Sequence, residues 1–275
     1  MQIDILYEDP DILVINKPPG VVVNRAATIQ VPTIQDWMID RLAAESGSQP
    51  EWASLVPVDF AATFGTPTDI FAERQGIVHR LDKDTSGAMI LAKNPGALVA
   101  LLSQFRLRQT TKKYLALVHG KFVVPEAIIN LPLGRASFDR KVFAVKAAGR
   151  EAVTKYKVVQ TFQEVNLIAL TALQPDLSHQ TLRRFSIYQG FSLVECWPKT
   201  GRTHQIRVHL AHTQHPLVGD TTYIGKKRKT LDPIWCPRQF LHAQSLSFSH
   251  PRTKEAMVVT APLTSDLQSV LDLLS

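Results

Sequence analysis

The chain has 275 residues, of which 45% are hydrophobic and 20% are charged. This composition is that of an ordinary globular protein and excludes a disordered or low-complexity chain. The formal net charge of +7 favours a polyanionic partner. Cys196 and Cys236 show no zinc-ligand spacing and predict a reducing, cytoplasmic setting. No basic segment precedes an apolar one at the start, and no apolar run reaches about 18 residues, so we expect neither a secretory signal nor a membrane span.

The first part of the chain contains one clear strand and one long irregular segment. The sequence ILVINKPPG, at residues 12–20, predicts a strand that stops at Pro18. Residues 25–75 are the least regular, with breakers at 47–50 and 65–67. We interpret residues 25–75 as an insertion that contains one helix, around residues 36–44, and not as a separate domain.

The next segment, GIVHRLDKDTSGAMILAKN at residues 76–94, places two aspartates in a turn before a short apolar strand at 88–92. Asp82 and Asp84 imitate the opening of a calcium loop, which requires a bidentate Glu at its twelfth position. That position is Lys93, and the metal interpretation therefore fails. Two interpretations remain open from the residues alone: a capped turn, and a catalytic carboxylate held beside cations.

A helix and a strand follow. Asn94 is a good N-cap and Pro95 fits the first helical position, which predicts a helix through residue 106. The sequence KKYLALVHG predicts a strand that ends at Gly120. Alternation places Leu115 and Leu117 on one face of this strand and Tyr114 on the other. A half-buried strand tyrosine is either core filler or a functional residue, and the pattern does not decide between them.

The second half predicts further strands near residues 153–159, 165–172 and 191–196, and another in RQFLHAQSLSFSHPRT before a short final helix. Thr203 is a candidate cap for a short helix with Ile206 and Leu210 on its core side. His204 and Arg207 share another face of that helix. Histidines stand at 204, 209, 212 and 215, but their spacing matches no zinc motif, and we expect no metal site.

Five segments occur in one order along the chain: YEDPDILVINKPPGVVV, HRLDKDTSGAMILAKN, KKYLALVHG, TGRTHQIRVHLAHTQHPLVGDTTYIG and FLHAQSLSFSHP. Together they resemble the motifs of the RluA-type pseudouridine synthases, and the resemblance covers nearly the whole chain. It implies an α+β fold, with a mixed, largely antiparallel β-sheet and flanking helices, in a single catalytic domain over residues 1–275. Larger family members carry an N-terminal S4-type RNA-binding domain, which we do not expect here.

The resemblance also implies roles for individual residues. Asp82 matches the family's essential aspartate, and Tyr114 matches the tyrosine that packs against the target base. Arg207 matches the arginine that pairs with the aspartate. Arg80 matches a residue that fills the gap left by the flipped nucleotide. Arg202 and His204 lie in the same signature and are expected to support substrate binding.

The implied reaction explains these residue types. Pseudouridine formation breaks the C1′–N1 bond, turns the uracil and joins C5 to C1′, so no cofactor or metal is expected. A guanidinium beside Asp82 favours the ionised carboxylate. No water has to be activated, so one carboxylate suffices where a glycosidase needs two. The base must be flipped out of its stack to react. Attack of Asp82 on C1′, addition to C6 and support of a glycal route stay open, as does the base at C5, for which Tyr114 is a candidate.

The expected partner is RNA, either ribosomal or transfer RNA, and we expect a monomer with no membrane association. The candidate RNA-binding cations are Arg106, Arg108, Lys112, Lys113 and the GKKRK sequence at 225–229. The segments 25–75 and 174–190 are candidates for shaping substrate choice. Two rival functions are a catalytically silent RNA-binding protein and a nucleic-acid glycosylase, which would release free uracil.

Overall fold

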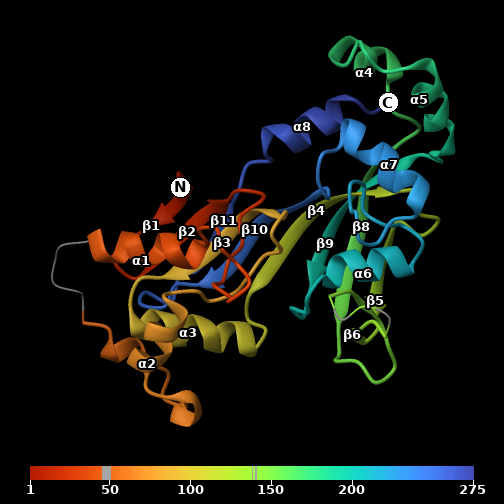
Figure 1. The fold of residues 1–275 in the computed structure, drawn as a ribbon. Coiled ribbons are helices and arrows are strands. Elements are labelled where there is room, and N and C mark those ends of the chain that lie inside the picture. Colours follow the sequence, from red (N-terminus) through yellow and green to blue (C-terminus); the bar gives the residue numbers. More distant parts are fainter. Residues whose placement is uncertain (45–50, 138, 140) are drawn as a thin grey trace. The chain divides into compact units, whose positions relative to one another are not determined.

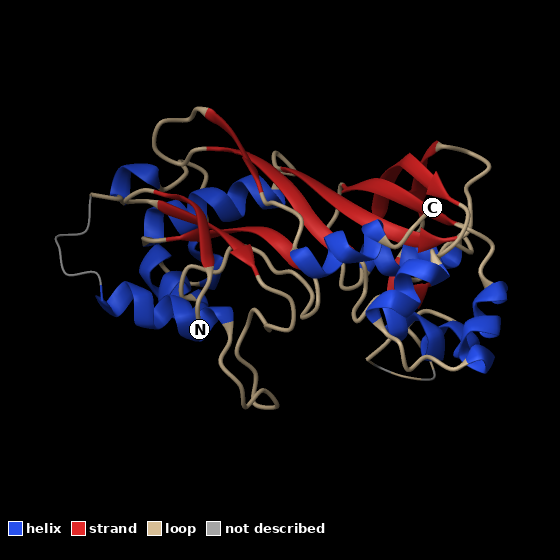
Figure 2. Ribbon diagram, turned by 90° about the horizontal axis from the view of Figure 1, so that it is seen from above, coloured by secondary structure: helices blue, strands red, loops and turns tan. Residues whose placement is uncertain are grey.

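The computed structural model describes residues 1–44, 51–137, 139 and 141–275. The chain forms two compact units: Met1–Lys112 with Ala243–Pro262, and Lys113–His242 with Leu263–Ser275. It passes from one unit to the other within β4 (Thr111–His119) and β10 (Leu241–Ser249). Both units combine strands with helices, which is the α+β arrangement that the family resemblance implies (Figures 1 and 2). The single catalytic domain stays a prediction.

The sheet of the first unit has the strand order β1-β2-β3-β10, with β11 (Ala256–Thr260) paired to β10. β1 (Asp4–Glu8), β2 (Ile12–Lys17) and β3 (Ser86–Ala92) pair antiparallel. All seven residues of β3 are buried, which explains why this strand has an apolar run without alternation. The predicted strands at 12–20 and 88–92 are confirmed, and β2 stops just before Pro18. β11 was not predicted.

Helix α3 (Pro95–Arg106) covers one face of this sheet. Asn94 caps it, because its side chain accepts a hydrogen bond from the amide of Ala97. Leu98 and Leu101 pack in one cluster with apolar residues of β2 and β3. The predicted helix, its cap and its buried face are confirmed.

The segment at 25–75 is more helical than its composition suggested. The predicted helix is confirmed as α1 (Ile34–Ala44), but α2 (Pro67–Arg74) and two 3-10 turns, Ala53–Leu55 and Ala62–Phe64, were missed. The breaker at 65–67 is in fact a helix start, in which Thr66 and Asp69 form a reciprocal capping box. The breaker at 47–50 lies outside the described residues. That this segment is an insertion stays a prediction.

The sheet of the second unit has the order β4-β9-β8-β5, with antiparallel β4/β9, β9/β8 and β8/β5 pairs. A two-stranded sheet adds β6 and β7. The predicted strands at 153–159 and 191–196 are confirmed. The bounds are β5 (Glu126–Asn130), β6 (Leu133–Arg135), β7 (Phe143–Val145), β8 (Val153–Phe162) and β9 (Phe191–Pro198).

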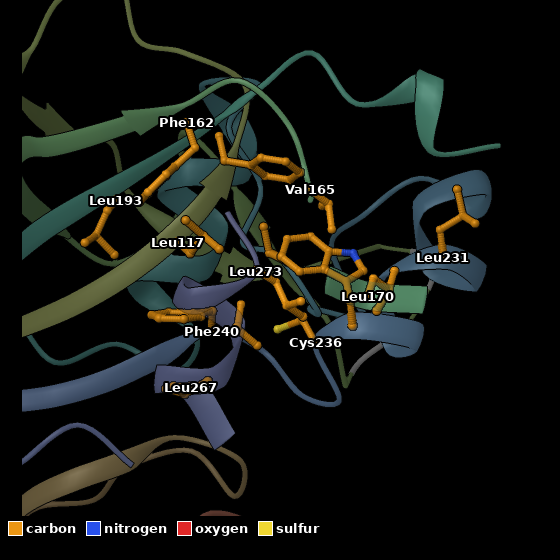
Figure 3. Packing of buried hydrophobic residues seen from close by; sticks show 14 of the residues in the cluster. Leu117, Phe162, Val165, Leu170, Leu193, Leu231, Cys236, Phe240, Leu267 and Leu273 are labelled. Atoms are coloured by element: carbon orange, nitrogen blue, oxygen red, sulfur yellow. The ribbon is translucent and has the colours of Figure 1, made fainter. Parts of the chain in front are cut away.

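Helices cover both faces of this sheet. Leu115 and Leu117 of β4 join the cluster in Figure 3 with α4 (Leu167–Leu173), α7 (Lys226–Trp235) and α8 (Ser265–Asp272). Between α4 and α7 the chain forms α5 (His179–Arg183) and the 3-10 turn Arg184–Ile187. Ala116 and Val118 face the other way and pack with Ile206 and Leu210 of α6 (Gln205–His212). The alternation predicted for β4 is confirmed.

Two local predictions in this unit are wrong. The strand expected at 165–172 is helix α4, because the Asn166 side chain accepts from the Ala169 amide and starts a helix. The cap expected at Thr203 is displaced by one residue. His204 is the N-cap, with a left-handed φ of 56° and no side-chain capping bond.

Candidate active site

Asp82 lies in a tight turn that enters β3. The amide of Thr85 donates to the carbonyl of Asp82 over 3.1 Å, which closes the turn. Asp82 is half-buried, whereas Asp84 is exposed and Thr85 is buried. Arg80, two residues earlier, is exposed. The two aspartates of the turn therefore differ in their exposure to solvent.

Lys17, at the end of β2, holds this turn through hydrogen bonds to main-chain carbonyls. It is fully buried, and its Nζ donates to the carbonyls of Pro18, Val21 and Lys83 over 2.7, 2.9 and 3.0 Å. A buried ammonium needs such acceptors to replace water. Sequence reasoning missed this contact. Its signal was a lysine placed between a buried strand and a Pro-Pro-Gly turn.

His79 fixes the other side of the loop. Its Nε2 accepts from the amide of Ile90 in β3 over 3.1 Å, and its ring stacks on Phe105 at 4.8 Å between centroids. Burial, with a smaller contribution from the charge of Lys112, lowers the pKa of His79 to about 3. His79 is therefore neutral at physiological pH and serves as an acceptor.

Gly87 is required where the turn meets the sheet. Its φ of +115° belongs to a region that L side chains rarely adopt, and an added Cβ would lie 2.3 Å from the carbonyl oxygen of Ala243. This close approach of β3 to β10 explains why the Thr-Ser-Gly sequence has a glycine at position 87.

Arg207 lies in α6 of the second unit and is buried. Its Nε and Nη2 bind the two carboxylate oxygens of Asp220 over 2.7 and 2.9 Å, and Nη2 also donates to Thr222 over 3.1 Å. The carboxylate of Asp220 is fully buried, so this is a bidentate ion pair away from water. Asp220 was missed as the partner of Arg207, although it follows in the same signature.

Tyr223 completes the surroundings of Arg207. The guanidinium carbon lies 5.1 Å from the centre of the Tyr223 ring. The phenol oxygen accepts from the amide of Phe143 in β7 and lies 2.9 Å from Nδ1 of His204. One tyrosine thus contacts two of the predicted site residues and β7.

The loop before α6 is held by Gln205. Its Oε1 accepts from the Thr200 hydroxyl and the Arg202 amide, and its Nε2 donates to the Val153 carbonyl and the Thr154 hydroxyl. The Arg202 side chain donates to the carbonyl of Glu151 over 2.9 Å. This bond shows Arg202 fastened to protein backbone, and its support of substrate binding stays a prediction.

Tyr114 occupies β4, half-buried, and packs beside the cluster of Ala116 and Val118. Arg80 and Asp82 belong to the first unit, whereas Tyr114 and Arg207, together with Arg202 and His204, belong to the second. Within the second unit Tyr223 brings Arg207 and His204 together. The pairing of Arg207 with Asp82 stays a prediction.

At least one histidine of the TGRTHQIRVHLAHTQHPLVGDTTYIG segment has a structural role. Both ring nitrogens of His209 are engaged, by Thr154 and by the carbonyl of Leu131. Within the described residues, one group of side chains has metal-ligand spacing: Asp9, Asp11 and His250 in the first unit. Arg252 binds Asp11 through both carboxylate oxygens, and His250 binds Asp9 directly. These contacts account for the group as an ion-pair network.

Residues 11–212 match the family model described as RNA pseudouridylate synthase. The chain belongs to the RNA pseudouridylate synthase family. It is 36% identical over 272 residues to an uncharacterized RNA pseudouridine synthase of Bacillus subtilis, covering 99% of this chain and 73% of the relative. It is 34% identical to the ribosomal large subunit pseudouridine synthase D of Pseudomonas aeruginosa, covering 100% of this chain and 72% of that protein.

Solved structures share the fold. Human RNA pseudouridylate synthase domain containing 1 matches with a TM-score of 0.65 at 24% identity, covering 98% of this chain and 87% of that one. The α+β prediction and the family resemblance are confirmed, and the enzyme is an isomerase that acts on uridine in RNA. In the part of the chain that the structure describes, no helix has the length and apolar character needed to cross a membrane.

Proposed function

We propose that the enzyme converts uridine to pseudouridine in ribosomal RNA of the large subunit, with Asp82 as its catalytic carboxylate. The observation that supports Asp82 is its position: it is half-buried in a turn fastened by Lys17 and His79, while Asp84 beside it is exposed. Several relatives that match over nearly the whole of this chain are named ribosomal large subunit pseudouridine synthase D, which supports ribosomal over transfer RNA.

The chemistry assigns a role to each site residue. The C1′–N1 bond breaks, the uracil turns, C5 joins C1′, and the proton leaving C5 balances the one gained at N1. Ionised Asp82 acts at C1′, at C6 or in the elimination to a glycal, and Arg207 stabilises its charge. Tyr114 stacks on the flipped base, Arg80 fills the vacated place, and Arg202 and His204 support binding.

The setting follows from the same proposal. Cys196 and Cys236 are buried free thiols, which suits a reducing cytoplasm. We propose a monomer that needs no cofactor and no membrane. Burial raises the pKa of both thiols, so neither cysteine offers a reactive thiolate at neutral pH.

The test treats unmodified ribosomal and transfer RNA with the wild type and with Asp82→Asn, then maps pseudouridine by carbodiimide labelling and primer extension. We expect a new site in ribosomal RNA with the wild type and none with D82N. A site in transfer RNA alone would overturn the substrate. Free uracil with an abasic site would favour a glycosylase, and RNA binding without any modification would favour a silent binding protein.

A further inference from the structure

Two segments of the second unit carry a dense positive charge. Residues 177–190 contain Arg183 and Arg184, residues 221–231 contain Lys226, Lys227, Arg228 and Lys229, and neither segment contains Asp or Glu. All six side chains are exposed except that of Arg228, which is half-buried. We call these six residues the α7 basic surface.

Contacts within the unit hold the two segments side by side. The Arg184 guanidinium donates to the hydroxyl of Thr230 in α7 over 2.6 Å. Further along, the Tyr188 hydroxyl donates to Asp232 over 2.8 Å. The 174–190 segment, which the sequence marks as a candidate for shaping substrate choice, therefore lies against α7, and its Arg184 contacts Thr230, the residue that follows the four cations.

The charge of this surface is not balanced from within. Asp232, the one acid in α7, is fully buried and already binds His119, Tyr188 and the Gly219 amide. Among the described residues, the side chains of Lys226, Lys227 and Lys229 have no ion-pair partner, and that of Arg183 has none either. Two other candidate RNA-binding cations do have ion-pair partners, since Arg106 binds Asp59 and Lys113 binds Glu195.

The arrangement also has an electrostatic cost in the isolated protein. Four cations occupy consecutive positions at the start of α7, where the helix dipole disfavours positive charge. The first turn contains no acid, and Gly225 provides no side-chain cap. Residues that lower the stability of the fold are typical of functional sites. Four cations at a helix N-terminus are such residues, and they indicate a partner with negative charge.

We propose that the α7 basic surface binds phosphates of the RNA substrate outside the nucleotide that is isomerised. This inference rests on the proposed activity toward structured RNA. RNA is favoured over an acidic protein because the enzyme's family acts on RNA, and phosphate is the anion that clustered Lys and Arg meet there. The segment at 174–190 then contributes to substrate choice by adding Arg183 and Arg184 to the contact.

The test compares Lys226→Gln/Lys227→Gln with a matched control, Lys121→Gln/Lys157→Gln, which removes the same charge from exposed lysines elsewhere in the unit. Binding to a ribosomal RNA domain and to a short stem-loop carrying the target uridine is measured over a range of salt. For the long RNA we expect K226Q/K227Q to reduce the slope of log K against log salt by about 1 to 2. The control should keep the wild-type slope.

Kinetics and stability separate binding from structural damage. In multiple turnover on the long RNA, K226Q/K227Q should have a higher KM than the wild type and an unchanged kcat. Its thermal midpoint should equal or exceed that of the wild type, because repulsion is relieved. Equal slopes for K226Q/K227Q and the control would overturn the proposal, as would equal loss on both RNAs. If the wild type makes no pseudouridine, the proposed function itself fails. The pseudouridine assay shows this independently of the RNA-binding slopes.

Discussion

The turn that carries Asp82 and the helix that carries Arg207 are held by different kinds of contact. Around Asp82 the contacts hold the main chain: Lys17 donates to a carbonyl of the turn, and His79 accepts from an amide of β3. Around Arg207 the side chain itself is fastened, by the carboxylate of Asp220 and the ring of Tyr223. The first arrangement holds the main chain of the turn that carries Asp82, whereas the second holds the long, flexible side chain of Arg207 itself.

The largest effect is expected at Asp220. Its replacement by Ala leaves a buried guanidinium without its bidentate partner, which costs about 3 to 5 kcal/mol of unfolding free energy. Urea denaturation measures the loss. Thr222→Val removes one bond to the same guanidinium and should cost about 1 kcal/mol. A D220A variant within experimental error of T222V would contradict the account.

Lys17→Met tests the fastening of the main chain. It leaves three carbonyls without the donor that Lys17 supplies, and we expect a loss of about 2 kcal/mol together with slower pseudouridine formation. The matched variant is Lys83→Met. Lys83 is exposed and offers only its carbonyl to Lys17, so K83M should keep the wild-type stability. Equal stability of K17M and K83M would show that the buried lysine does not hold the turn.

His79 makes the first region sensitive to acid. Its pKa of about 3 lies below the ordinary value of 6.5, so the unfolded chain binds the proton more tightly. The contribution of His79 to stability is therefore complete above pH 6.5 and is lost as the pH falls toward 3. His79→Phe keeps a ring on Phe105 but removes the acceptor for Ile90, at a cost of roughly 1 to 2 kcal/mol at neutral pH. The difference between H79F and wild type should shrink on acidification, and a constant difference would be contrary to this reasoning.

The smallest effect is expected at Tyr223. Tyr223→Phe keeps the ring near Arg207 but loses the bonds to His204 and the Phe143 amide, for a cost of about 1 kcal/mol. Tyr223→Leu also removes the ring from Arg207 and should lower kcat further. If Y223F and Y223L lose activity equally, the hydroxyl and not the ring positions Arg207.

The two regions also differ in how far sequence reasoning reached. The turn at Asp82 was predictable, because turn residues and an apolar strand lie within a few positions of each other. Its fastening by Lys17 was not, because residues 17 and 83 are distant in sequence and only the folded sheet brings them together. Asp220 and Tyr223 followed in the same signature as Arg207, but no pattern indicated which carboxylate the arginine binds.

Predictions from local sequence patterns were wrong where one pattern fits two kinds of secondary structure. The apolar run after Asn166 fits a strand or a helix, and the asparagine cap decides for α4. Gly65 and Pro67 were taken as breakers although Thr66 between them starts α2. His204 has a left-handed backbone, which a sequence pattern for a non-glycine residue does not reveal.

The most direct test of the central claim compares Asp82→Asn with Asp84→Asn, two equal changes in one turn. Tritium release from RNA labelled at C5 of uridine is measured with enzyme in excess, after both variants are shown to keep the wild-type thermal midpoint and RNA affinity. We predict no release above background for D82N and a rate close to wild type for D84N. Release by D82N at the wild-type rate, or its loss in D84N alone, would contradict the assignment of Asp82 as the catalytic carboxylate.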